Sequence, residues 1–234
     1  MRRTVEMELL DELPAGDSRA VRSRSDLRRL NYIMGHAAIL SGALRNHAPA
    51  GAPGARPLQL VELGAGDGTL FLELARRCSI PGVRVEVTLV DRLNLVSLET
   101  RRAFAALAWT VESVATDVFV WLEQRAPTID VLFANLFLHH FADARLQTLL
   151  QLAEARTQAF VACEPRRSPR ALWAARMLWL IGCNAVTQHD AVVSVRAGFY
   201  GRELSSLWPD NGGWVINERP AGLFSHQFAA HRNA

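Results

Sequence analysis

A glycine-rich stretch at residues 61–69 reads Val61-Glu62-Leu63-Gly64-Ala65-Gly66-Asp67-Gly68-Thr69. A short apolar run at 58–63 leads into it, and a pattern with helical spacing at 67–77 follows it. Glycines between a strand and a helix let the backbone turn tightly and approach a ligand with no Cβ in the way. The stretch therefore predicts a ligand-binding loop that opens an α/β unit.

The residues around these glycines indicate the charge of the ligand. A dinucleotide fingerprint needs Gly or Ala at the sixth position counted from Gly64, and that position holds Thr69. Glu62, two residues before the first glycine, would repel the phosphates of a dinucleotide. An acidic loop instead favours a cationic ligand. S-adenosylmethionine is one, since it carries an ammonium and a sulfonium group and no phosphate.

Strands and helices alternate after this loop. Apolar, β-branched runs predict strands at 58–63, 83–90, 109–116, 129–135 and 159–164. Helical spacing predicts helices at 67–77, 93–107, 117–124 and 142–155. Two further runs predict an antiparallel hairpin at 213–219 and 223–231. We expect an α/β fold with a Rossmann-like, seven-stranded, mostly parallel sheet and helices on both of its faces.

The remaining segments predict a lid and a cap. Helical patterns at 4–13 and 18–46 indicate an N-terminal helical appendage or lid, residues 1–47. A linker rich in proline and glycine, 48–57, joins it to the main domain, 58–234. Within that domain we expect an apolar helix at 168–181, a short helix at 201–208, and a substrate cap over 184–212.

Residues 62–68 match the ExGxGxG motif that opens class I S-adenosylmethionine-dependent methyltransferases, and polar residues follow the later strands in the order typical of that family. On these motifs the chain resembles this family, and in particular its small-molecule members of quinone and phenol biosynthesis. The resemblance is strong over 58–164, and the 213–231 hairpin is similar to the family's last two strands. It implies S-adenosylmethionine as cofactor and S-adenosylhomocysteine as product.

The resemblance also implies which residues contact the cofactor. These residues are Glu62, Gly64, Gly66, Asp91, Asp117, Val118 and Asn135. In the family, the acid at the position of Asp91 binds the ribose hydroxyls, and the acid at Asp117 reads the adenine edge together with the next backbone N–H. Asn135 would lie where the methyl group is transferred. As an alternative, Asp91 and Asp117 could each cap the helix that follows.

Two adjacent histidines, His139 and His140, follow the strand that ends at Asn135. A phenol has a pKa of about 10, so it is mostly protonated at neutral pH. A histidine can take that proton as the oxygen attacks the methyl group. Because adjacent residues cannot both face one point, at most one would act as base, and we prefer His139. Alternatively, one caps a helix and the other packs against Phe137 and Phe141.

Other candidates lie outside the core motifs. Tyr32 and Asn31 on the lid helix could contact the cofactor, although Tyr32 could simply pack that helix onto the domain. His189-Asp190 is a second acid/base candidate, with a capped helix start as the favoured alternative. Arg166 and Arg167 could hold an acidic substrate group, with solvation at the surface favoured. The stripe around Trp173 and Trp179 could belong to the core or line an acceptor pocket.

Several partner and ligand classes are disfavoured. His139, His140 and His189 do not have convincing metal-ligand spacing, and no acidic trio or CxxC motif occurs, so we expect no metal. The net charge of +3 comes from scattered arginines, which is not typical of a nucleic-acid binder. No apolar run is long enough to span a bilayer, and no signal peptide is recognisable, so we expect a cytoplasmic protein. A homodimer is left open.

These patterns favour methyl transfer to a small molecule. Our first expectation is O-methylation of a phenolic or quinol intermediate in natural-product or lipid biosynthesis, with an aromatic or lipidic acceptor. Carbon methylation of a quinone-like ring is the nearest alternative. An NAD(P)-dependent oxidoreductase and a catalytically inactive binding protein are the alternatives from other classes.

Overall fold

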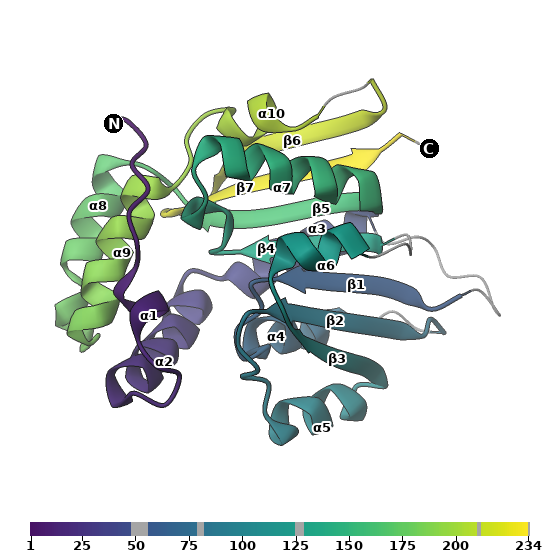
Figure 1. Ribbon diagram of the computed structural model, residues 1–234, viewed down its shortest axis with the longest axis horizontal. Coiled ribbons are helices and arrows are strands. Elements are labelled where there is room, and N and C mark those ends of the chain that lie inside the picture. The colour runs from purple at the N-terminus through teal and green to yellow at the C-terminus, as the bar shows by residue number, and fades with distance from the viewer. Residues whose placement is uncertain (48–55, 79–81, 125–128, 210–211, 234) are drawn as a thin grey trace.

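The computed structural model describes residues 1–47, 56–78, 82–124, 129–209 and 212–233. Its centre is a seven-stranded sheet in the order β3-β2-β1-β4-β5-β7-β6 (Figure 1). The strands are β1 (Leu58–Leu63), β2 (Val85–Asp91), β3 (Trp109–Ala115), β4 (Ile129–Asn135), β5 (Thr157–Pro165), β6 (Trp214–Ala221) and β7 (Ser225–Arg232). Strands β1 to β5 run parallel, whereas β7 pairs antiparallel with β5 and β6. The predicted fold class is confirmed.

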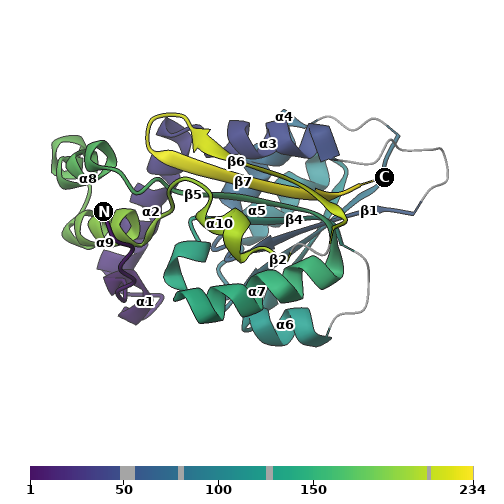
Figure 2. The same cartoon turned by 90° about the horizontal axis from the view of Figure 1, so that it is seen from above.

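Helices cover both faces of the sheet (Figure 2). One apolar layer lies under α3 (His36–His47), α4 (Thr69–Arg77) and α5 (Leu98–Ala106). The other lies under α6 (Val118–Gln124), α7 (Asp143–Arg156) and α10 (Glu203–Leu207). Large buried rings join helix to sheet, as where Phe71 of α4 meets Phe133 of β4 edge to face, with ring centroids 5.2 Å apart. This packing fixes the strand ends on which the polar residues sit.

The N-terminal segment departs from the predicted pattern. The single helix predicted over 18–46 is wrong, because α2 (Ser18–Ile33) and α3 are separate helices. Gly35 has a φ of 69°, a left-handed conformation that breaks the helix there. Leu40 and Leu44 of α3 are fully buried, so α3 is a helix of the α/β core rather than of a detachable lid. The helix predicted over 4–13 shrinks to α1 (Leu9–Glu12). Residues 48–55 of the predicted linker lie outside the described residues.

A group of helices lies beyond the carboxyl ends of the parallel strands, where α9 (Ala185–Ala197) packs against α1, α2 and α8 (Pro169–Arg176) (Figure 1). The helix predicted over 168–181 is divided into α8 and a short 3₁₀ turn, η2 (Leu178–Ile181). Trp173 and Trp179 are 67% and 56% exposed, so neither belongs to the core. No helix in the described ranges combines the length and apolar character needed to cross a membrane.

Candidate functional site

The glycine loop follows β1, and the strand order of the sheet reverses between β1 and β4. Leu63 at the end of β1 pairs with Val90 of β2 on one side and with Ala134 of β4 on the other. Ligands of open α/β sheets bind outside the carboxyl ends of the strands at such a point. The sheet therefore brings together the strand-end residues that the sequence singled out.

Gly64 can only be a glycine in this loop. Its φ is 68°, and a Cβ built there would lie 2.2 Å from the ring of Phe137. Gly66 also has a positive φ, 55°, but a Cβ there would meet nothing within 4 Å. The close approach of Phe137 to Gly64 ties the glycine loop to the segment that carries the two histidines.

Asp91 faces the glycine loop from the end of β2. Its Oδ2 accepts a hydrogen bond from the N–H of Gly66 at 2.9 Å, and its Oδ1 accepts one from the N–H of Leu93 at 2.9 Å. The N-cap of α5 is Ser97, so Asp91 does not have the alternative role of capping that helix. The carboxylate is thus held beside the loop, at the position from which the resemblance would have it bind a ribose.

Asp117 caps the helix that follows it. Its Oδ1 accepts a hydrogen bond from the N–H of Phe119 at 2.8 Å, which satisfies a free donor in the first turn of α6. Its Oδ2 lies 4.0 Å from Arg145. Val118 is the first residue of α6 and is buried. The helix-cap alternative thus describes this conformation, and adenine recognition by Asp117 and Val118 stays a prediction.

Two buried polar atoms near the loop have no hydrogen-bond partner in the described structure. They are Oε2 of Glu62 on β1 and Oδ1 of Asn135 at the end of β4. Burial, together with the nearby carboxylates of Asp67 and Asp91, raises the pKa of Glu62 well above its usual value. A buried acceptor without a donor is costly. A cationic ligand with N–H donors would satisfy both atoms.

Helix α2 covers this edge of the sheet. Arg28 forms an ion pair with Asp67 of the glycine loop at 2.7 Å. The side-chain amide of Asn135 donates to Oδ1 of Asn31 at 3.3 Å, and Nδ1 of His36 donates to the same oxygen at 2.8 Å. The predicted lid helix therefore contacts both the loop and the end of β4.

Tyr32 lies at the rim of this cover. It is 78% exposed and, with Arg28, Asn31 and Thr69, lines a cavity of about 310 Å³ between α2, α3 and α4. The exposed ring does not pack α2 onto the domain, which was the alternative to a cofactor contact. The contact itself stays a prediction.

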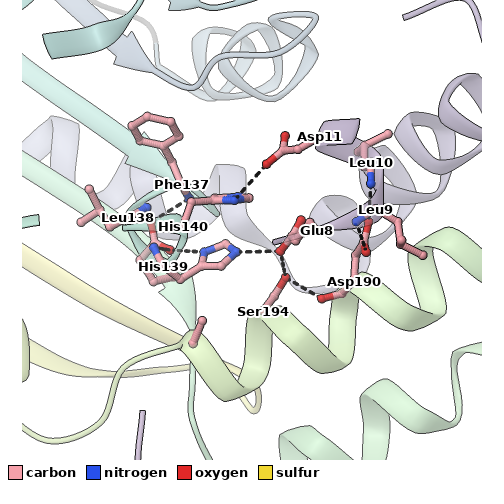
Figure 3. A network of polar contacts seen from close by, with 12 residues as sticks. Glu8, Leu9, Leu10, Asp11, Phe137, Leu138, His139, His140, Asp190 and Ser194 are labelled. Atoms are coloured by element: carbon pink, nitrogen blue, oxygen red, sulfur yellow. Dashed lines mark hydrogen bonds and ion pairs between the residues drawn. The ribbon is translucent and has the colours of Figure 1, made fainter. Parts of the chain in front are cut away.

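His139 is buried between two carboxylates (Figure 3). Its Nδ1 lies 2.8 Å from Oε2 of Glu164, and its Nε2 lies 3.2 Å from Oε1 of Glu8. Glu164 lies one residue before the end of β5 and also accepts hydrogen bonds from the backbone N–H groups of Phe137 and Leu138, at 3.0 and 2.9 Å. Both ring nitrogens of His139 are therefore engaged by acidic side chains.

These contacts fix the protonation of the cluster. Burial lowers the pKa of His139, but the hydrogen bonds to Glu164 and Glu8 outweigh it and raise that pKa to about 9. Burial opposes ionisation of Glu8 as well, but the hydrogen bond from His139 and the charge of His139 lower the pKa of Glu8 to about 2. At neutral pH His139 is an imidazolium held by two carboxylates, so it has no free lone pair with which to accept a proton.

His140 differs from its neighbour. Its side chain is 25% exposed, and its Nδ1 lies 3.4 Å from Asp11. No carboxylate is within hydrogen-bond distance of a second ring nitrogen of His140 among the described residues. Of the two histidines, His140 is the one that a molecule entering from solvent can reach.

The N-terminal segment that supplies Glu8 is fixed at both ends. The guanidinium of Arg3 donates to the carbonyl oxygen of Phe141 at 2.9 Å and pairs with Asp143 at 2.7 Å. The carboxylate of Asp190 on α9 accepts from the backbone N–H groups of Leu9 and Leu10, at 2.8 and 3.0 Å. These bonds hold Glu8 in place against His139.

Solved structures place this geometry in a known fold, although no family model and no curated protein matches the sequence. An O-methyltransferase family protein from Burkholderia thailandensis is similar with a TM-score of 0.61 and 18% identity, over 94% of this chain and 61% of that one. The plantazolicin methyltransferase BamL, solved with S-adenosylhomocysteine, is similar with a TM-score of 0.64 and 10% identity, over 96% and 93% of the two chains. The chain has the class I methyltransferase fold.

A third structure of this methyltransferase fold is the magnesium protoporphyrin IX methyltransferase of Synechocystis PCC 6803 with bound S-adenosylhomocysteine. It has a TM-score of 0.54 and 14% identity, over 86% of this chain and 83% of that one. The chain spans only about three fifths of the Burkholderia protein, whereas it covers most of the other two.

Some minor candidates on this methyltransferase fold have different roles from those expected. Asp190 caps α1 rather than the start of its own helix, whose N-cap is Asn184. Arg167 is buried, and it binds the carbonyl oxygen of Gly198 at 3.2 Å and the carboxylate of Glu203, so the expectation of a solvated arginine is wrong. The sequence predicted no role for Glu8 or Glu164, which meet His139 only in the folded chain.

Proposed function

We propose that this protein transfers the methyl group of S-adenosylmethionine to a hydroxyl oxygen of a small phenolic or quinol acceptor. The oxygen forms a bond to the methyl carbon as the bond between that carbon and sulfur breaks. The electron pair of the broken bond stays on sulfur in S-adenosylhomocysteine. The hydroxyl proton must leave at the same stage. Most of the rate would come from holding the two reactants in line.

The observation that carries this proposal is the pair of unpartnered buried acceptors, Glu62 Oε2 and Asn135 Oδ1. They flank the glycine loop at the ends of β1 and β4, and the ammonium of S-adenosylmethionine can donate to both. A dinucleotide would bring pyrophosphate oxygens to the same place, and these would meet acceptors instead of donors. The site therefore supports the methyl donor over a nicotinamide cofactor.

Most of the other residues that would contact the cofactor lie at the ends of the strands. Asp91 would give up the hydrogen bond from the N–H of Gly66 and accept hydrogen bonds from the ribose hydroxyls instead. Hydrogen bonds to a charged acceptor such as this carboxylate are strong. Asp117 and the N–H of Val118 would meet the adenine, and Asn135 would border the transferred methyl group. Tyr32, at the exposed rim of α2, would close over the bound cofactor.

We assign the role of base to His140. The sequence favoured His139, but His139 is an imidazolium between Glu164 and Glu8 and would have to lose one of these partners first. His140 is partly exposed next to Asp11 and can meet a hydroxyl directly. The acceptor would then lie on the His140 side of the cluster.

The test is methyl transfer to a panel of phenols and quinols, followed by NMR of the products. We expect methyl ethers from the wild-type protein. His140→Ala should lower the transfer rate by about 10²–10⁴-fold with unchanged affinity for S-adenosylmethionine. His231→Ala is the matched control, because His231 lies on β7 beside the start of β5, at the opposite end of the sheet from the cluster. Methylation on a ring carbon would establish the C-methyltransferase alternative, and full turnover by His140→Ala would remove His140 from the reaction.

A further inference from the structure

The fold brings three metal-ligating side chains to one point. Glu8, His139 and His140 each offer a ligand atom, and these atoms lie within 4.8 Å of one another. Glu8 comes from the N-terminal segment and the histidines follow β4, so the cluster joins parts of the chain 131 residues apart (Figure 3). Two imidazoles and one carboxylate are a donor set that suits zinc and other divalent transition metals.

The spacing fits the bond lengths of zinc. Two ligands at about 2.0–2.1 Å from a tetrahedral zinc ion are about 3.3 Å apart. Oε1 of Glu8 and Nε2 of His139 are 3.2 Å apart. A ring nitrogen of His140 lies within 4.8 Å of both atoms, so the partly exposed ring would move toward the ion to become a third ligand. The fourth position would be left open toward solvent.

The atoms around these ligands also match a metal centre. A histidine that binds zinc usually donates its other ring N–H to a carboxylate, which orients the ring. Nδ1 of His139 has such a partner in Glu164, at 2.8 Å, and the backbone N–H groups of Phe137 and Leu138 hold Glu164 in turn. The hydroxyl of Ser194 donates to Glu8. Glu8 and His139 are thus oriented before any ion binds.

The carboxylate ligand is not on a loose arm. Arg3 and Asp190 hold the backbone on either side of Glu8 through the bonds described above. The side chain of Glu8 is only 12% exposed. Binding an ion would therefore cost little ordering of the chain.

We propose that Glu8, His139 and His140 bind one Zn²⁺ ion, which takes the place of the proton shared by His139 and Glu8. The catalytic role of this ion rests on the proposed function. A hydroxyl of the acceptor, bound at the open fourth position of the zinc ion, would lose its proton more readily. In the metal-free protein His140 would be the base, whereas with the ion bound His140 would be a ligand and the hydroxyl proton would pass to solvent water. The presence of the site itself does not depend on methyl transfer.

The experiment measures metal binding alone. Protein stripped with a chelator is titrated with Zn²⁺ by calorimetry and with Co²⁺ by visible absorption, which reports tetrahedral coordination. We expect one ion per chain. Glu8→Gln and His140→Ala should each weaken Zn²⁺ binding at least tenfold, and Glu164→Gln by about 10–100-fold. Glu6→Gln, on the same segment, and His231→Ala, on β7 at the opposite end of the sheet, are the matched controls and should bind as the wild type does.

The outcomes separate the metal site from the proposed function. No Zn²⁺ binding by the folded wild-type protein, or binding that Glu8→Gln and His140→Ala leave unchanged, would overturn the site. If wild-type protein that binds no Zn²⁺ still transfers methyl groups, the metal site is overturned but the proposed function stands. Zn²⁺ binding as expected, with no binding of S-adenosylmethionine, would keep the metal site and overturn the proposed function.

Discussion

Glu62 and Asp91 are both carboxylic acids at strand ends beside the glycine loop, but their surroundings differ. Asp91 accepts two backbone hydrogen bonds, whereas Oε2 of Glu62 is buried with no donor. Burial without a donor favours the neutral acid, which is why the pKa of Glu62 is raised. A ligand cation at Glu62 would reverse this balance and draw out the proton.

We therefore predict that S-adenosylmethionine binding releases a proton at pH values below the raised pKa of Glu62. Its ammonium favours the ionised form of Glu62, so the pKa of Glu62 falls on binding and the carboxyl group loses its proton. Calorimetry in buffers with different ionisation enthalpies measures the number of protons released. Glu62→Gln should abolish the release and Glu86→Gln, on the neighbouring strand, should not. Equal release by wild type and Glu62→Gln would contradict this role.

At the scale of elements, the glycine loop and the segment after β4 support one another through Gly64 and Phe137. The ring of Phe137 fills the space that a side chain at Gly64 would need. It also packs edge to face on Phe141, with centroids 5.1 Å apart. The position of the histidine segment thus depends on a glycine in the loop.

Gly64→Ala should destabilise the fold more than Gly66→Ala. Both residues have positive φ, so each substitution costs about 1 kcal/mol of backbone strain. Only at Gly64 does the new Cβ meet a ring, which adds about 1–3 kcal/mol of overpacking. Urea unfolding of the two variants measures the difference. Equal stabilities would show that Phe137 moves aside without cost.

Local sequence patterns predict the sheet well and the end helices poorly. Strands β1 and β4 have the predicted bounds because each is a short run rich in apolar residues. The sequence does not predict α9, whose buried residues include Val186 and, nine positions later and so on the opposite side of the helix, Val195. They do not form one stripe, because α9 packs against α1, α2 and α8 at once. A helix buried on several sides loses the amphipathic signal.

At the scale of the whole molecule, helix α3 ties the N-terminal segment to the sheet. His36 at its start is fully buried, and its two ring nitrogens bond to Asn31 on α2 and to Ser225 on β7, at 2.8 and 2.9 Å. Burial lowers the pKa of His36 to about 4, so the folded protein holds this ring neutral. In the unfolded chain the ring gains a proton below its ordinary pKa of about 6.5.

This difference predicts how stability depends on pH. Because the pKa of His36 is lower in the folded protein than in the unfolded chain, acid favours the unfolded chain. The free energy of unfolding is therefore highest above about pH 6.5 and decreases as the pH falls toward 4. Between pH 7 and 5, wild type should lose about 2 kcal/mol more unfolding free energy than His36→Gln. Urea unfolding at the two pH values measures this. Parallel changes in the two proteins would mean that His36 does not couple folding to protonation.

Long-range contacts limit what the sequence can reveal about the site. Glu62, Gly64, Asp91 and Asn135 could be predicted as neighbours, because parallel strands bring their carboxyl ends to one edge. Glu8 could not, since it meets His139 across 131 residues of chain and only through the folded N-terminal segment. For the same reason the spacing of the histidines along the sequence predicted no metal cluster.

The central claim is that the glycine loop binds S-adenosylmethionine, and a calorimetric titration tests it most directly. We predict that S-adenosylmethionine and S-adenosylhomocysteine each bind once per chain and that NAD does not bind. Asp91→Ala should weaken both adenosyl ligands by about 10–100-fold, the value of a charged hydrogen bond. Glu112→Ala on β3 is the control. A folded protein that binds neither adenosyl compound, or that binds NAD in their place, would contradict the account.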